Sequence, residues 1–313
     1  MTKILRFSIN HIERAKEIAL MNYNEERAAV TALPQILECP DLEHFANNGL
    51  GVAMFNDSEM LGFLCCYESW DNAFNSTAKG TFSPIQAHGT IAQNRDLIYK
   101  GLYQAAAEKW VLHKITYHAI ALYTHDSQAL NAFLNYGFGL RCIDAIRPLV
   151  AFEHKPHEGI VFNEIAKTES AMLREMRRLL KIHLGESPCF MRSSPEDVES
   201  WLKRAEKRKT REFVAMQNDK PIAFIEIGDD GETFATEVSS MMNICGAFCL
   251  RKYRGKGIVQ GLLNYAISAL KAEGYDSLGV DFESFNPTAS GFWLKYFTAY
   301  TGSVVRRIDE CSL

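Results

Sequence analysis

The sequence has no long hydrophobic run, and no stretch approaches the roughly 18 consecutive apolar residues that a membrane-spanning helix needs. Its first residues also lack the extended apolar core of a secretory signal peptide. We therefore expect a cytoplasmic protein with no membrane partner. Positive charge is not in excess either, since the formal net charge is −4, and this argues against a nucleic acid as partner.

Cysteines with metal-binding spacing are missing as well. The chain has 8 cysteines, but none of them form a Cys-x-x-Cys pair, and no histidine cluster has the spacing of a zinc site. We expect no metal, and we expect the cysteines to be buried thiols in a reducing compartment.

The length of the chain favours two domains. A chain of 313 residues is long for one compact domain, and a hydrophobic content of 47% is enough for two cores. Residues 153–159 are polar and include proline and glycine, so they are the predicted linker. The predicted domains are residues 1–152 and residues 153–313.

An internal repeat supports this division. Residues 52–57 read Val-Ala-Met-Phe-Asn-Asp and residues 214–219 read Val-Ala-Met-Gln-Asn-Asp. Residues 126–129 (Asp-x-x-Ala) and 286–289 (Asn-x-x-Ala) recur at nearly the same separation. A nearly constant offset indicates two copies of one unit, whereas the alternative is a chance likeness of apolar patterns. Within the first copy, the polar residues 68–84 are predicted to be a long connection.

Residues 248–263 carry the strongest functional signal. They predict an apolar strand, a basic loop with two glycines, and an amphipathic helix. The first N–H groups of a helix have no partner inside it, and together with the helix dipole they suit an anion such as a diphosphate. Gly255 and Gly257 let the backbone approach the anion, and Arg254 and Lys256 add positive charge. The alternative is an ordinary strand–turn–helix with solvated basic residues.

The order Arg254-x-x-Gly257-x-Val259 resembles the acyl-CoA loop of the GNAT acyltransferase superfamily, although Val259 replaces a small residue. The residues after this loop are also similar to GNAT chains: they predict a helix, a strand near residues 278–282, and a second motif over residues 286–293. The resemblance implies an α/β (α+β) fold of two tandem GNAT-like domains. Each domain would be a mixed, mostly antiparallel sheet flanked by helices.

The resemblance further implies that acetyl-CoA binds as the acyl donor. It would lie in a V-shaped opening between the fourth strand, predicted near residues 242–250, and the fifth strand. A bulge in the fourth strand would expose backbone groups to the thioester. The residues expected to contact acetyl-CoA are Phe248, Cys249, Leu250, Arg254, Gly255, Lys256, Gly257, Ile258, Val259, Asn286, Phe292 and Trp293.

The resemblance defines the catalytic residues less well. GNAT enzymes usually have a tyrosine in the second motif that protonates the leaving thiolate, but Trp293 stands at that position. We therefore expect Tyr296, one turn later on the same helix, to be the acid, and Glu283 to be the general base. Other carboxylates near predicted strands are alternatives for the base: Asp281, Glu226 and Glu237.

A nucleophilic cysteine is a further alternative to direct attack. Cys245 and Cys249 lie on the predicted fourth strand, but neither has a histidine near it in sequence that would activate the thiol. Direct attack of the acceptor on the thioester is the expectation.

The first copy has lost the anion-binding loop. At the repeat offset, Asn94, Leu97 and Tyr99 stand where the second copy has the arginine, the glycine and the valine of the loop. Leucine and tyrosine side chains would keep a phosphate away from the backbone. We expect the first domain to bind CoA poorly or not at all.

Together these features predict an N-acyltransferase that moves an acetyl (acyl) group from acetyl-CoA to a primary amine by direct attack. The acceptor would be a small molecule or a peptide, and neither its identity nor the oligomeric state can be read from the sequence. The alternative is a non-catalytic CoA-binding or interaction protein on the same fold, and the missing tyrosine favours it.

Overall fold

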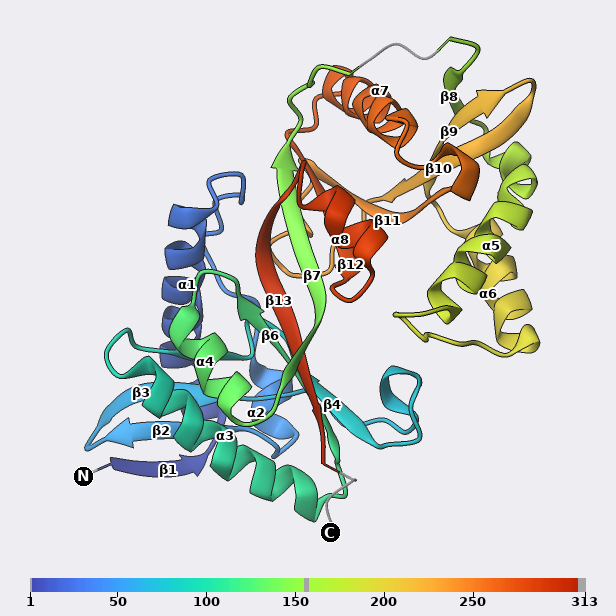
Figure 1. Cartoon of the computed structure of the whole chain (residues 1–313). Coiled ribbons are helices and arrows are strands. Elements are labelled where there is room, and N and C mark those ends of the chain that lie inside the picture. Colours follow the sequence, from blue (N-terminus) through green and yellow to red (C-terminus); the bar gives the residue numbers. More distant parts are fainter. Residues whose placement is uncertain (1, 155–157, 309–313) are drawn as a thin grey trace. The chain divides into compact units, whose positions relative to one another are not determined.

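The computed structural model describes residues 2–154 and 158–308 (Figure 1). The chain divides into two compact units. Unit 1 comprises Met1–Asp144, Thr233–Ala235 and Ala299–Leu313, and unit 2 comprises Ala145–Glu232 and Thr236–Thr298. Unit 1 therefore takes its last strand from the end of the chain. The predicted linker includes residues 155–157, which lie outside the described part of the chain, so the predicted boundary stays a prediction.

Unit 1 contains two groups of paired strands. Strands β1, β2, β3 and β5 form an antiparallel sheet in that order, while β6 pairs with β4 on one side and β13 on the other. The elements are β1 (Thr2–Arg6), α1 (Ile12–Ala29), α2 (Glu43–Asn47), β2 (Val52–Asn56), β3 (Glu59–Leu64), β4 (Gly80–Ser83), β5 (His88–Thr90), α3 (Arg95–Leu112), β6 (Tyr117–Tyr123), α4 (Ser127–Asn135), most of β7 (Gly139–Pro148) and most of β13 (Thr298–Arg307).

The antiparallel sheet of unit 1 is covered by a helix on each face. Successive side chains of a strand point to opposite faces. On β2, Ala53 packs into the core formed with α1, whereas Val52 and Met54 pack into the core formed with α3. The alternation places the sheet as a layer between the two helices, which Figure 1 shows.

Unit 2 contains a five-stranded arrangement in the order β8-β9-β10-β11-β12. The strands are antiparallel except for the parallel pair β11 and β12. The elements are β8 (Val161–Ile165), the 3₁₀ helix η3 (Lys167–Leu173), α5 (Arg174–Gly185), α6 (Pro195–Lys207), β9 (Arg211–Gln217), β10 (Lys220–Gly228), β11 (Met241–Cys249), the 3₁₀ helix η4 (Arg251–Tyr253), α7 (Ile258–Ala272), β12 (Ser277–Glu283) and α8 (Pro287–Trp293).

Helices also cover both faces of the unit 2 sheet. Glu212 of β9 bonds to Arg177 of α5, while the next residue, Phe213, lies 6.2 Å from the ring of Tyr265 on α7. Because neighbouring side chains point to opposite faces, α5 and α7 lie on different sides of the sheet. The predicted α/β class, with mixed sheets flanked by helices, is confirmed.

One predicted connection is wrong. Residues 68–84 contain β4, which pairs in parallel with β6 from Gly80 opposite Tyr117 to Ser83 opposite Ile120. The sequence of this strand is polar, and its partner lies more than thirty residues away, so the local pattern contains no sign of it.

Candidate active site

The parallel strands β11 and β12 separate partway along their length. Their pairing ends at Ile244 and Val280. At the same point β11 has a bulge, because the register with β10 skips Cys245. A bulge bends a strand and interrupts its ladder. The remainder of β11, residues 246–249, therefore leaves β12, as the predicted V-shaped opening requires.

A cavity of about 590 Å³ lies against the end of β11, entirely within unit 2. It is also lined by the glycine loop, the start of α7, α8 with the turn after it, and the last turns of α5. Most residues predicted to contact acetyl-CoA line it: Phe248, Cys249, Arg254, Gly255, Gly257, Ile258, Val259, Asn286, Phe292 and Trp293. Leu250 and Lys256 are not among its described lining residues. The structure thus brings the loop and the second motif together.

The start of α7 presents N–H groups without an intrahelical acceptor at this cavity. Helix α7 begins at Ile258, and its first backbone bond runs from the Gly261 N–H to the Gly257 carbonyl oxygen, 3.0 Å. The N–H groups before Gly261 therefore have no acceptor inside the helix. Gly257 has φ +79° and Gly255 has φ +73°, a conformation that glycine adopts with little strain. The sequence places glycine where the loop must turn into the helix.

Arg254 is held beside these N–H groups. Its Nε donates to the carbonyl oxygen of Cys249 at 3.0 Å, and its guanidinium lies 5.3 Å from the centre of the Phe248 ring. The cation–π contact and the hydrogen bond fix the charge at the wall of the cavity. An anion here would meet the positive end of a helix and an oriented arginine.

Asn286 shapes the opposite wall. It is 7% exposed, and its Oδ1 accepts hydrogen bonds from the Thr288 N–H at 3.2 Å and the Ala289 N–H at 3.4 Å. These bonds cap the first turn of α8. The cap and Pro287 at the first helical position explain why the helix begins here.

Aromatic rings form the apolar part of the lining. Phe292 lies 4.8 Å from Trp293 and 5.0 Å from Tyr296, measured between ring centres. Tyr296 also stacks on Phe152 at 5.0 Å. Tyr296 lines the cavity, but it does not lie on the helix as predicted. Helix α8 ends at Trp293, and the Tyr296 N–H bonds back three residues to the Trp293 carbonyl oxygen, so the chain tightens into a turn before β13.

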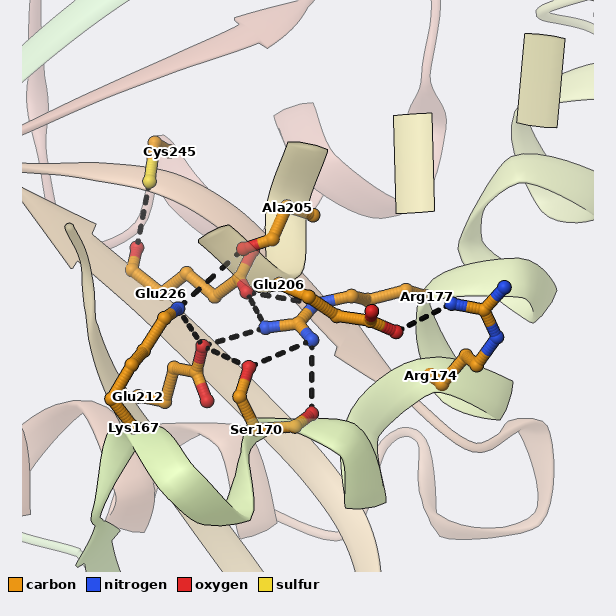
Figure 2. A network of polar contacts seen from close by, with 9 residues as sticks. All are labelled: Lys167, Ser170, Arg174, Arg177, Ala205, Glu206, Glu212, Glu226 and Cys245. Carbon is orange, nitrogen blue, oxygen red and sulfur yellow. Dashed lines mark hydrogen bonds and ion pairs between the residues drawn. The ribbon is translucent and has the colours of Figure 1, made fainter. Parts of the chain in front are cut away.

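None of the carboxylates predicted as bases is among the described lining residues of the cavity. Glu283 ends β12, and among the described lining residues of the cavity it is absent, as are Asp281, Glu237 and Glu226. Glu226 belongs to a buried network, in which its Oε1 accepts from Nε of Arg177 at 2.9 Å (Figure 2). Arg177 also bonds Glu212 at 2.8 Å and the Ser170 carbonyl oxygen at 3.0 Å. Glu226 is therefore engaged in an ion pair rather than facing the cavity.

The two cysteines of β11 are poor candidates for a nucleophile. Burial raises the pKa of the Cys245 thiol to about 12 and that of the Cys249 thiol to about 11. Both thiols are therefore protonated near neutral pH, and the thiolate is the reactive form. The described cysteines form no disulfide bond.

The wall supplied by α5 was not predicted. Leu180 and His183 line the cavity, and His183 Nε2 lies 3.1 Å from Thr288 Oγ1 on α8. The sequence gives little sign of this role for His183. A single histidine near a helix end belongs to no motif that would link it to the glycine loop, which lies about seventy residues later in the sequence. Only the packing of α5 against β11 brings it there.

In unit 1 the start of α3 and the start of α4, which correspond to the starts of α7 and α8 in the repeat, are joined by an ion pair. Helix α3 begins after Asn94, which has φ +55° like the glycine before α7. Arg95, the first residue of α3, donates to Asp126, the N-cap of α4, at 3.0 Å and to Glu25 at 2.7 Å. Arg95 is 7% exposed. A buried arginine paired with two carboxylates therefore occupies the start of α3, where an added anion would meet acidic groups.

Similarity to known proteins supports the fold. Residues 176–297 match the family described as acetyltransferase (GNAT) family, and this segment contains every described lining residue of the cavity. No curated protein matches the sequence significantly.

Solved structures extend the likeness beyond that segment. A GCN5-related N-acetyltransferase from Sphaerobacter thermophilus is similar with a TM-score of 0.58 and 12% identity, over 98% of this chain and 95% of that one. The GCN5-related glucosamine N-acetyltransferase region of a fungal multi-domain GH3 β-N-acetylglucosaminidase has a TM-score of 0.53 and 12% identity, over 97% of this chain and 38% of that one. In both cases the likeness in fold extends over nearly the whole of this chain.

The described residues contain neither a membrane span nor a metal cluster. No described helix is long and apolar enough to cross a membrane. Among the same residues, no group of three or more His, Cys, Asp or Glu side chains is arranged to hold a metal ion.

Proposed function

We propose that this chain, whose residues 176–297 match the acetyltransferase (GNAT) family, is an N-acyltransferase that moves an acetyl group from acetyl-CoA to a primary amine. The observation that carries the proposal is the cavity between the end of β11 and α8, with the start of α7 at one wall. The helix start and Arg254 suit an anion, and the aromatic lining suits an apolar chain. This combination would accommodate a diphosphate joined to the pantetheine arm of CoA.

The residues present fit acetyl-CoA. The N–H groups at the start of α7 and the guanidinium of Arg254 would bind the diphosphate. Phe248 and Phe292 would contact the arm from two sides of the cavity. The bulge at Cys245 would leave backbone groups of β11 available to the thioester oxygen, where a donor stabilises developing negative charge.

In this proposal acetyl-CoA supplies the activated acetyl group, and the protein orients the reactants and moves protons. The amine nitrogen attacks the carbonyl carbon, the carbon–sulfur bond breaks, and the thiolate takes a proton. Tyr296 is the proposed donor of that proton, because its ring lines the cavity. Glu283 remains the predicted base that removes the proton of the amine.

The tandem arrangement belongs to the same proposal. Unit 1 would keep the fold without holding CoA, because Arg95 and Asp126 join the helix ends that would face the diphosphate. Its role would be structural.

A non-catalytic CoA-binding protein is the second candidate, favoured by Trp293 at the position of the usual tyrosine. Trp293 is 6% exposed and offers no ionisable hydroxyl. One experiment separates the two. Acetyl-CoA is titrated calorimetrically, and thiol release is then followed with a panel of amines that includes glucosamine, amino acids and peptides. Binding with amine-dependent thiol release supports the enzyme, and binding without turnover on any amine supports the second candidate. No binding overturns both.

A further inference from the structure

His183 faces the cavity from the last turn of α5. It lines the cavity together with Arg254, and its ring centre lies 6.4 Å from that of Phe248. On the far side, its Nε2 lies 3.1 Å from the hydroxyl oxygen of Thr288. The histidine therefore joins α5 to α8 across the cavity wall.

The hydrogen bonds around Thr288 determine which nitrogen of neutral His183 carries the proton. The Thr288 hydroxyl donates to Asn286 Oδ1 at 2.8 Å, and this oxygen also accepts from two backbone N–H groups, so it acts only as an acceptor. A hydroxyl has one proton to donate. Thr288 must therefore accept from His183 Nε2–H, and the lone pair of the neutral ring is on Nδ1.

The surroundings of His183 favour its neutral form when no anion is bound. Burial lowers its pKa below the ordinary value, and the nearby guanidinium of Arg254 lowers it further, while Glu186 acts in the opposite direction. Cys249, Tyr253, Lys295 and Tyr296 are the other titratable groups that line the cavity. Two neighbouring cations would repel each other, and an anion bound between them would offset this repulsion.

We propose that His183 is an anion-binding residue of this cavity, which takes up a proton on Nδ1 when a diphosphate binds beside Arg254. This inference rests on the proposed CoA site and adds one residue to it. The protonated ring would keep its Nε2–H bond to Thr288 and present a second charged donor to the anion. Diphosphate binding and protonation of His183 would then strengthen each other.

The direction of the pH effect is determined by this linkage. Below the pKa of unliganded His183 the ring is already charged, so affinity for the diphosphate is greatest. As the pH rises through the pKa of the complex, the charge is lost in both states and affinity reaches its minimum. Between these limits the linked proton changes the affinity by up to about tenfold per pH unit.

The test uses 3′-dephospho-CoA as ligand, because the 3′-phosphate of CoA would itself titrate near a pKa of about 6. Dissociation constants are measured by calorimetry between about pH 5 and pH 8 for the wild type and His183→Gln. Glutamine can donate to Thr288 but cannot be protonated. His113→Gln, on the exposed end of α3, is the matched control. Pantetheine, which lacks the diphosphate, is the control ligand.

We expect affinity of the wild type and of His113→Gln to fall several-fold to tenfold with rising pH, with proton uptake in buffers of different ionisation enthalpy. His183→Gln should bind at all pH values with about the high-pH affinity of the wild type, and pantetheine should bind without a His183-dependent pH effect. Thermal unfolding verifies that the variant is folded.

An identical pH profile in the wild type and His183→Gln would overturn the role of His183 and leave the CoA site standing. A His183-dependent profile that is the same for pantetheine would also overturn it, because the diphosphate would not be involved. Failure of the folded wild type to bind dephospho-CoA at any pH would overturn the proposed function itself.

Discussion

Gly257 is the residue at which the loop becomes the helix, and its φ of +79° disfavours any side chain. Gly257→Trp should abolish CoA binding, since an indole would occupy the space beside the N–H groups of α7, while the protein still folds. The left-handed conformation alone costs a non-glycine residue roughly 1–2 kcal/mol. Calorimetric titration with CoA and thermal unfolding measure the two effects separately.

Gly274 offers the matched control for that substitution. It has φ +92°, lies just beyond the other end of α7, and a Cβ added there would meet no atom within 4 Å. Gly274→Trp should therefore carry a similar backbone strain and still bind CoA. Retained binding in Gly257→Trp would mean that the diphosphate lies elsewhere.

A substitution at Tyr296 separates the proposed proton transfer from the binding of acetyl-CoA. Tyr296→Phe keeps the ring that stacks on Phe152 and contacts Phe292, but removes the hydroxyl. We expect kcat to fall about 10²-fold, the usual contribution of a positioned acid, while the Kd for acetyl-CoA changes little. Steady-state kinetics with an accepted amine and calorimetry give the two values. An unchanged kcat would assign the proton transfer to water or to another group.

At the scale of elements, the bulge of β11 is supported by the buried network of Figure 2. Glu226 lies opposite Gly246, and a Cβ on that glycine would come within 2.7 Å of the Glu226 Oε2. Arg177, with 0% exposure, holds Glu226 and Glu212. The network therefore packs a carboxylate against the strand at the point where it leaves β12.

Removing the arginine should be costly. Arg177→Met leaves Glu226 buried without its cation and leaves Glu212 with Lys167, at 2.6 Å, as its remaining cation. Breaking a buried pair in this way costs about 3–5 kcal/mol. Urea unfolding of the variant measures the loss. The triple variant Arg177→Met/Glu212→Gln/Glu226→Gln removes the charges together and should recover much of the stability. A loss below about 1 kcal/mol in the single variant would show that water reaches these groups.

Elements with a local pattern could be predicted, and those that depend on distant partners could not. Helix α7 has an apolar face at helical spacing, so its start at Ile258 was predicted correctly. The end of α8 was not, because the turn to Tyr296 is determined by the entry into β13. Arg177, Glu212 and Glu226 look like solvated charges in sequence. Their pairing, like the place of His183, arises only when α5 packs on the sheet.

At the scale of the molecule, unit 1 depends on the end of the chain. All of β6 is buried, and Tyr117–Tyr123 pair with residues 301–307 of β13. A fragment of residues 1–152 lacks β13 and would expose the backbone groups of β6. We expect this fragment to aggregate or to lack cooperative unfolding in urea. Adding a separately produced 153–313 fragment, which contains β13, should restore cooperative unfolding. A monomeric, cooperative 1–152 fragment would contradict this expectation.

The two units should also differ in the ligand that they hold. Unit 2 presents the start of α7 to a cavity, whereas in unit 1 Arg95 joins the start of α3 to Asp126 and Glu25. Calorimetry should therefore give one CoA per full-length chain, and Gly257→Trp should remove that single site. Arg95→Ala should destabilise the protein, because it leaves Asp126 buried without its cation, but should not add a second site. Two sites in the wild type, or one site that survives in Gly257→Trp, would mean that unit 1 binds CoA in spite of its ion pairs.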